Sequence, residues 1–166
     1  MRVLFAALTN VAVDNVLAGL LAQVDEGEEP DFVRVGSVRR IAAAVLPQST
    51  HGKLARDDEI ATRRELEREL QVAPASEHAA IRQAISLIDS GRMAQRARAI
   101  KKYTVVGATC AATGLACMAG LRFQIVLLDE CSQLTEPASL VPLAKLDCER
   151  LLAVGDPMQL PPTLHA

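Results

Sequence analysis

Two adjacent acidic residues, Asp129 and Glu130, directly follow the continuous aliphatic run Ile125–Leu128. Carboxylates at the end of a buried strand suit two tasks in phosphoryl transfer, because one can hold Mg²⁺ and the other can orient or deprotonate the attacking water. A simpler interpretation is that Asp129 only caps a following helix, as aspartate often does. The pair by itself leaves both interpretations open.

Four aliphatic runs, including this one, end in small or polar residues. The runs and the residues that follow them are Val3–Leu8 with Thr9 and Asn10, Tyr103–Ala108 with Thr109, Phe123–Leu128 with Asp129 and Glu130, and Leu151–Val154 with Gly155 and Asp156. The carboxyl ends of parallel strands lie on one edge of a sheet, where open α/β folds bind their ligands. We therefore expect these residues to converge on one site.

The runs themselves predict the fold class. They do not alternate apolar with polar residues, and a fifth run, Phe32–Val35, has the same character. This pattern is typical of strands that are covered on both faces of a parallel sheet. The segment Val11–Val24 carries apolar residues on nearly every helical face, as a helix buried against a sheet does. The alternation predicts a three-layer α/β domain with a mainly parallel sheet, flanking helices and right-handed crossovers.

The segment from about 53 to 102 differs from the rest of the chain. It is rich in Arg, Glu, Ala and Leu, and its apolar residues recur at helical spacing in two stretches separated by a turn near Pro74–Ser76. We expect a helical insertion of two amphipathic helices, with Ser76 as a cap of the second.

The second of these helices ends in a run of cations with no intervening acid: Arg92, Arg96, Arg98, Lys101 and Lys102. Arg92 and Arg96 share a face at helical spacing. Such a run is either a solvated helix face or a contact with nucleic-acid phosphates. A contact would make the affinity for nucleic acid depend on salt.

Composition excludes several classes of protein. The 166 residues carry a net charge of −2, so no global basic field attracts a polyanion and any nucleic-acid surface must be local. The four cysteines form no CxxC pair and have no histidine at zinc-finger spacing, which indicates reduced cysteines in an intracellular protein. The apolar N-terminal segment is interrupted by Asn10, Asp14 and Asn15, which argues against both a signal peptide and a membrane span.

Several segments resemble motifs of the up-frameshift-like superfamily 1 helicases. Residues 129–138 resemble motif II, and residues 155–162 resemble motif III. Thr9–Asp14 is similar to motif Ia, and Val105–Cys110 is similar to the segment often called Ic. The segment Phe32–Arg40, together with Leu128–Pro162, is most similar to the GRF-zinc-finger-containing 5′-to-3′ DNA helicases. The resemblance covers nearly the whole chain and is weakest between residues 51 and 102.

The resemblance implies part of a RecA-like P-loop NTPase domain, the first motor domain (1A), with ATP and Mg²⁺ as cofactors. Asp129 would coordinate Mg²⁺ and Glu130 would polarise the attacking water. Gln159 would approach the γ-phosphate as a further catalytic residue. Gly155 and Asp156 would belong to the same nucleotide site, although Gly155 could be no more than a turn glycine.

The resemblance also implies that Thr9, Asn10 and Thr109 lie along a single strand of nucleic acid and contact its phosphates. A Thr-Asn pair in front of a helix leaves free backbone N–H groups at the helix N-terminus, and these favour a phosphate oxygen. Asn10 could instead cap that helix, or do both.

Three departures from the family pattern bear on activity. No GxxxxGK[ST] occurs, so the phosphate-binding loop and its strand are missing, and we expect them upstream of the chain. The second motor domain is also missing, and we expect it downstream. Met158 stands where the family usually has a lysine. We expect the 166 residues alone to be inactive, and to leave a sheet edge unpaired that makes them marginally stable.

The sequence therefore predicts a fragment of an ATP-dependent helicase that unwinds nucleic acid in the 5′-to-3′ direction. The likeness favours single-stranded DNA as partner, a nuclear location and a role in DNA repair, with no membrane partner; it leaves oligomeric state open. One alternative is a non-catalytic, nucleic-acid-binding remnant of a helicase. Another is a P-loop ATPase that moves no nucleic acid.

Overall fold

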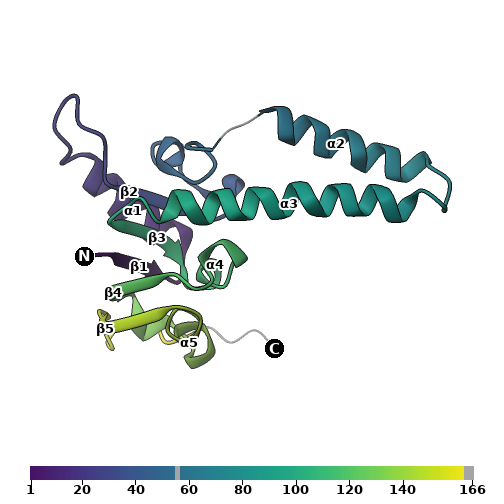
Figure 1. Cartoon of the computed structure of the whole chain (residues 1–166). Helices are drawn as coiled ribbons and strands as arrows, with labels where there is room; N and C mark the ends of the chain where they lie inside the picture. Colours follow the sequence, from purple (N-terminus) through teal and green to yellow (C-terminus); the bar gives the residue numbers. More distant parts are fainter. Residues whose placement is uncertain (55–56, 163–166) are drawn as a thin grey trace.

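The computed structural model describes residues 1–54 and 57–162. Five parallel strands form one sheet in the order β2-β3-β1-β4-β5, with helices on both faces (Figure 1). The strands are β1 (Val3–Ala7), β2 (Phe32–Val35), β3 (Val105–Thr109), β4 (Arg122–Asp129) and β5 (Asp147–Ala153). The helices are α1 (Asn10–Leu21), α2 (Asp57–Val72), α3 (His78–Ile100), α4 (Cys110–Thr113) and α5 (Glu136–Lys145), with 3₁₀ turns at η1 (Val38–Arg40), η2 (Leu46–Gln48), η3 (Ala116–Met118) and η4 (Cys131–Gln133). The predicted α/β class with a parallel sheet is confirmed.

The two faces of the sheet have separate cores because side chains alternate along each strand. Phe5 and Ala7 of β1 pack with α1 residues on one face. Leu4 and Ala6 pack on the opposite face with the end of α3 and the segment around η3. Gly107 of β3 lets α1 approach closely, since a Cβ there would lie 2.6 Å from the Leu17 side chain.

The first helix packs against the sheet as predicted, through Val13 and Leu17, although Val11 on its outer side is 68% exposed. Two details of the sequence prediction are wrong. The strand predicted at Leu151–Val154 begins four residues earlier, at Asp147, because polar residues at the start of this edge strand conceal it in the sequence. The strand predicted from Tyr103 begins at Val105, since the Thr104 amide bonds the Asp31 carboxylate instead of joining the ladder.

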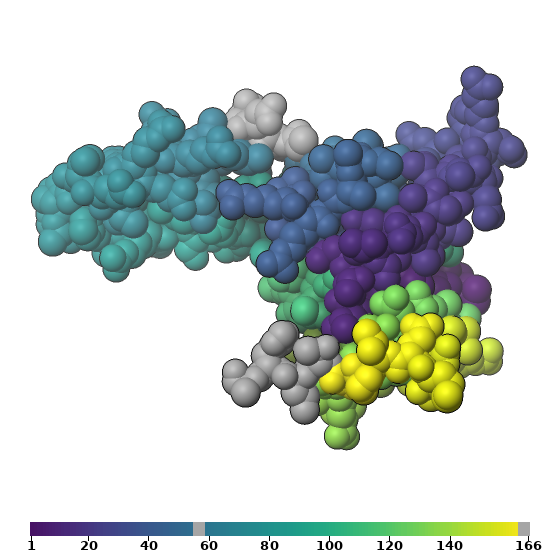
Figure 2. Space-filling model, turned by 180° about the vertical axis from the view of Figure 1, so that it is seen from behind, coloured from purple at the N-terminus to yellow at the C-terminus, as the bar shows by residue number. Residues whose placement is uncertain are grey.

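The two helices predicted between residues 53 and 102 are confirmed as α2 and α3. They form a hairpin that projects as an arm from the body of the sheet (Figures 1 and 2). Arg63 of α2 pairs with Asp89 of α3 at 2.8 Å between Nε and Oδ1, which joins the two helices. The predicted cap is wrong: Glu77 occupies the N-cap position and no side chain closes the first turn of α3.

β5 is the outer strand of the described sheet on the β4 side. Leu151 and Leu152 are 49% and 53% exposed, so this edge presents apolar side chains as well as unpaired backbone groups. In the part of the chain that the structure describes, no helix combines the length and apolar character needed to cross a membrane.

Candidate functional site

The strand register brings the predicted site residues to one edge. Ala7 of β1 is paired with Thr109 of β3 on one side and with Asp129 of β4 on the other. Ala153 of β5 lies opposite Leu128 in the same way. All these strands run in parallel, so their carboxyl ends form a common border, which we call the carboxyl rim.

One hollow of about 340 Å³ at this rim contains every residue predicted for the nucleotide site. It is lined by Asp129, Glu130, Ser132, Val154, Gly155, Asp156 and Gln159, and we call it the Asp129 hollow. Its lining has three carboxylates and no cationic side chain. It is therefore suited to a cation and to groups that a cation neutralises.

The acidic pair has an unusual backbone. The Asp129 carboxylate accepts a hydrogen bond from the Glu130 amide at 3.0 Å, so it does not cap a helix. Glu130 has φ 52° and ψ 36°, and it is the one non-glycine residue with positive φ among the described residues. Left-handed backbone of this kind disfavours an L-residue by about 1–2 kcal/mol and is frequently kept at functional sites. The backbone at Glu130 is therefore strained.

Gly155 is required for space and not for a turn. Its φ is not positive, whereas a Cβ on it would lie 2.7 Å from the Ser132 amide nitrogen and 2.9 Å from Cys131 Sγ. The Cys131 amide also donates to the Val154 carbonyl at 2.9 Å. The loop after β4 and the loop after β5 are therefore in direct contact, which holds Gln159 near the acidic pair.

Asp156 shapes the loop that carries Gln159. Its Oδ1 accepts from the Met158 amide at 2.9 Å, and its backbone carbonyl accepts from the Gln159 amide at 3.1 Å. The Gln159 side chain reaches Asp156 Oδ2 at 3.5 Å. Met158, in the usual lysine position, is 90% exposed. The Asp156 carboxylate, which was predicted to bind the cofactor, thus already stabilises the loop that carries Gln159.

The donor set fits Mg²⁺. Within residues 1–54 and 57–162, no cluster of three His, Cys, Asp or Glu side chains is arranged to hold a metal ion. Mg²⁺ commonly takes one or two carboxylates and completes its octahedron with waters and substrate phosphates. Asp129, with one oxygen free of partners among the described residues, can supply such a ligand.

A second hollow at the rim contains two of the three residues predicted to contact nucleic acid. It is lined by Asn10, Gly36, Ser37, Arg40, Thr109, Ala111, Ala112 and Leu115, and we call it the Asn10 hollow. Arg40 gives this lining a positive charge, and no acid belongs to it. Thr9 lies outside the hollow, on the exposed surface beside it.

The two threonines have the same local role. Thr9 Oγ1 accepts from the Ala12 amide at 3.1 Å and caps α1, and Thr109 Oγ1 accepts from the Ala112 amide at 3.2 Å and caps α4. The cap considered for Asn10 is therefore provided by Thr9. Each hydroxyl keeps its own proton for donation to another acceptor, such as a phosphate oxygen.

A buried charge network beneath the Asn10 hollow was not predicted. Arg34 of β2 is fully buried, and its Nε donates to Asp14 Oδ1 of α1 at 2.6 Å. Its Nη1 donates to the Val35 carbonyl at 2.6 Å, and its Nη2 donates to Asn10 Oδ1 at 2.9 Å. Asp14 Oδ2 accepts from the Ala42 amide at 2.7 Å. The one signal in the sequence was a lone arginine inside an apolar strand, since buried charges need partners.

This network fixes the orientation of Asn10. Because Arg34 can only donate, the Asn10 oxygen must be the atom that accepts from it. The Asn10 amide nitrogen, which has no hydrogen-bond partner among the described residues, is then available as a donor in the hollow. A donor in a cationic hollow is suited to a phosphate.

Burial keeps Cys110 out of this chemistry. All four are free, and Cys110 and Cys117 are buried. Burial raises the pKa of the Cys110 thiol to about 11, which keeps it protonated and unreactive at neutral pH.

Comparison with known proteins agrees with the geometry. Residues 59–166 match a family described as an AAA domain. The chain is 46% identical over 166 residues to the 5′-3′ DNA helicase ZGRF1 of Mus musculus, across 99% of this chain and 8% of that protein. It is 30% identical over 173 residues to the Probable helicase MAGATAMA 3 of Arabidopsis thaliana, across 99% of this chain and 18% of that protein.

A shorter match, 47% identical over 45 residues, covers 27% of this chain and 2% of the Helicase SEN1 of Saccharomyces cerevisiae. The chain thus spans less than a fifth of each of these relatives. The parallel sheet, the order of the motifs along its rim and these matches agree with one another. The chain belongs to the AAA domain family, and its resemblance to the up-frameshift-like helicases is supported by its similarity to these helicases.

Proposed function

We propose that this chain is part of the first motor domain of an ATP-dependent helicase that translocates 5′ to 3′ along single-stranded DNA. The observation that carries the proposal is the pairing of two hollows of opposite charge on one rim. The Asp129 hollow and the Asn10 hollow lie at the ends of neighbouring strands, β4 and β1. A nucleotide and a nucleic-acid strand bound there would be close enough to influence each other.

The proposed roles follow from the chemistry of each hollow. Asp129 would hold Mg²⁺, Glu130 would orient the attacking water, and Gln159 would contact the γ-phosphate of ATP. Mg²⁺ supplies neutralisation of the phosphate charge when it is bound. Gly155 allows the two loops to touch, and Asp156 holds Gln159 in place.

On the other hollow, Asn10 would donate its amide to a strand phosphate and Thr109 would contribute at the same edge, with Thr9 on the adjoining surface. Phosphate contacts of this kind position a strand without reading its sequence. DNA as the substrate and 5′-to-3′ as the direction are supported by the name of the mouse relative. A nuclear location is proposed on the same basis, as the compartment of a DNA substrate.

We propose further that these 166 residues alone do not hydrolyse ATP. The chain has no phosphate-binding loop of its own, and a second domain normally supplies arginine side chains that stabilise the transition state. The exposed apolar edge of β5 supports completion of the nucleotide site by further chain. A non-catalytic remnant is less well supported, because the strained backbone of Glu130 would have no purpose in it.

The test is Glu130→Gln in the full-length protein, assayed for single-strand-stimulated ATP turnover and for binding of a nucleotide analogue. Removal of a general base reduces the rate by a factor on the order of 10²–10⁴, so turnover should fall by that factor while binding stays near normal. Glu69→Gln, at an exposed position of α2, is the matched control. ATPase activity near the wild-type rate in the Glu130 variant would remove this residue from the mechanism.

A further inference from the structure

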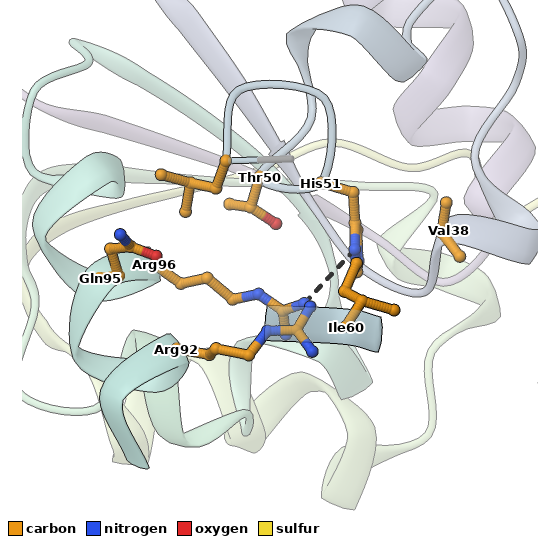
Figure 3. A pocket seen from close by; sticks show the side chains of 8 residues that line it. Val38, Thr50, His51, Ile60, Arg92, Gln95 and Arg96 are labelled. Atoms are coloured by element: carbon orange, nitrogen blue, oxygen red, sulfur yellow. Dashed lines mark hydrogen bonds between the residues drawn. The ribbon is translucent and has the colours of Figure 1, made fainter. Parts of the chain in front are cut away.

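A third pocket lies between the arm and the body of the sheet, where residues 38–54 face α2 and α3. It measures about 180 Å³, and its lining includes Thr50, His51, Ile60, Arg92, Gln95 and Arg96 (Figure 3). A water molecule occupies about 30 Å³ in the liquid, so several waters, or a phosphate group in their place, fit here. We call it the Arg92 pocket.

The two arginines in this pocket have no carboxylate partner among the described residues. Asp89, an acid on the same helix, is bound to Arg63. Arg96 is half-buried, and its pKa is lowered first by burial and then by the charge of Arg92, with smaller opposing effects from Cys117 and Asp89. Two like charges held close together in a partly buried pocket, with no carboxylate paired to either, are unfavourable, and an anion bound between them would relieve this.

Hydrogen bonds orient Arg96 toward the pocket. His51 Nε2 lies 2.9 Å from the Gly36 carbonyl, which can only accept, so the ring proton is on Nε2. His51 Nδ1 is then an acceptor and takes a hydrogen bond from Arg96 Nη2 at 3.3 Å (Figure 3). Burial lowers the pKa of His51, which keeps the ring neutral in this role. The guanidinium group is thus held from one side and open to a ligand on the other.

The pocket is also level with the carboxyl rim. α3 runs along the strands and ends at Ile100, near the start of β3 (Figure 1). Arg92 precedes Ile100 by eight residues, or about 12 Å of helix, whereas the five residues of β3 span about 16 Å. Residues 36–38 join the two cavities, since Gly36 and Ser37 line the Asn10 hollow and Val38 lines the Arg92 pocket.

We propose that the Arg92 pocket binds a backbone phosphate of the same single strand whose other phosphates lie in the Asn10 hollow. This inference rests on the proposed function. Arg92 and Arg96 supply the charge, and the Thr50 hydroxyl and the Gln95 amide line the pocket as further donors. The arm is then part of the strand-binding surface. Of the cation run on α3, Arg92 and Arg96 serve this site, whereas Arg98, Lys101 and Lys102 are exposed.

The experiment measures the affinity of the full-length protein for labelled single-stranded oligothymidylates across a range of KCl concentrations. The variants are Arg92→Gln and the double variant Arg92→Gln/Arg96→Gln. The control is Arg82→Gln/Arg98→Gln, which removes two exposed charges from the same helix. The slope of log K against log salt should fall by about 0.7 for each phosphate that the variant no longer neutralises. Arg92 makes no hydrogen bond to a described residue, so the single variant tests the site even if the double variant folds poorly.

The length of the oligonucleotide provides a second criterion. The effect of the arginine substitutions should vanish for oligonucleotides too short to extend from the Asn10 hollow to the Arg92 pocket. A decrease in slope no greater than in the control, or one that is the same at every length, would overturn the inference. Weaker binding of a labelled ATP analogue, with strand binding unchanged, would assign the pocket to a nucleotide phosphate and overturn it too.

These outcomes are distinct from failure of the proposed function. A wild-type protein that binds no single strand defeats the proposed function, and this inference with it. A wild-type protein that binds single strands while the arginine variants match the control defeats only the inference.

Discussion

The carboxyl rim has two halves that are built in opposite ways. At the ends of β1, β2 and β3, functional side chains rest on a buried, fully hydrogen-bonded base: Arg34 is bound by Asp14, Asn10 and a backbone carbonyl. At the ends of β4 and β5, three carboxylates face an open hollow, and residues 151–160 are exposed throughout. The base of the first half is buried and hydrogen-bonded, whereas the second half has three carboxylates in an exposed loop region that no cationic side chain of its hollow neutralises.

The two halves hold their functional side chains in place in different ways. The half at the ends of β1, β2 and β3, which we call the Asn10 half, uses a buried ion pair to fix one amide group, so its geometry depends on packing beneath the surface. The half at the ends of β4 and β5, which we call the Asp129 half, depends on close contact between two loops and on one strained residue, Glu130. If this comparison is correct, substitutions in the first half should act mainly on stability, and substitutions in the second should act mainly on nucleotide chemistry.

The largest effect is expected from breaking the buried pair. Asp14→Ala leaves the Arg34 guanidinium buried without its carboxylate, which should destabilise the fold by about 3–5 kcal/mol. Hydrogen exchange of the β1, β2 and β3 amides in the full-length protein measures this as easier opening of the sheet.

The control is the double replacement Asp14→Leu/Arg34→Met, which removes both charges. It should recover much of the lost stability, because no unpaired charge remains, yet it should still weaken single-strand binding since Asn10 loses its support. Full strand affinity in the double variant would show that Asn10 does not need Arg34.

The next largest effect is expected from Gly155→Ala in the other half. The added Cβ would meet Ser132 and Cys131 at 2.7 and 2.9 Å and push the loops apart, which overpacks the contact by about 1–3 kcal/mol. ATP turnover should fall while single-strand affinity stays within error, as measured by ATPase and anisotropy assays. Gly19→Ala is the matched control, since a Cβ on this exposed residue of α1 meets nothing within 4 Å and alanine favours a helix. Weaker strand affinity in the Gly155 variant would contradict the separation of the two halves.

The sequence predicted the elements and the rim well, because both depend on local patterns. Continuous apolar runs identified the strands, and polar residues at their ends identified the edge where Asp129 and Thr109 lie on either side of Ala7. The acidic start of β5 was missed since an edge strand does not need an apolar sequence. The assignment of the site residues to ATP and to a strand stays a prediction.

The contacts between segments distant in the chain could not be predicted in this way. No pattern shows that Arg34 reaches Asn10, or that Gly155 lies against Cys131, because both depend on the register of separate strands. The Arg92 pocket has the same origin: the sequence shows two arginines on one helix face, and only the fold places His51 opposite them.

The smallest effect on stability is expected at Glu130 itself, and the sign of the change tests whether its backbone is strained. Glu130→Gly should relieve about 1–2 kcal/mol of left-handed strain in the folded state. It should also lower stability by about 0.4–1 kcal/mol, because glycine gives the unfolded chain more conformational entropy. The net result should be a gain in stability of up to about 1.6 kcal/mol together with loss of turnover. Glu130→Gln keeps the strain and should show the loss of turnover alone. Glu136→Gly, at the start of α5, should be destabilising instead because glycine there has no strain to relieve.

Thermal unfolding midpoints of these three variants, compared with the wild-type midpoint, test whether the Glu130 backbone is strained. A stabilised, inactive Glu130→Gly would mean that the fold tolerates strain at this residue for the sake of the carboxylate. If the glycine variant is no more stable than wild type, the left-handed backbone is not strain retained for catalysis, and the Asp129 half would have to be explained by the loop contact at Gly155 alone.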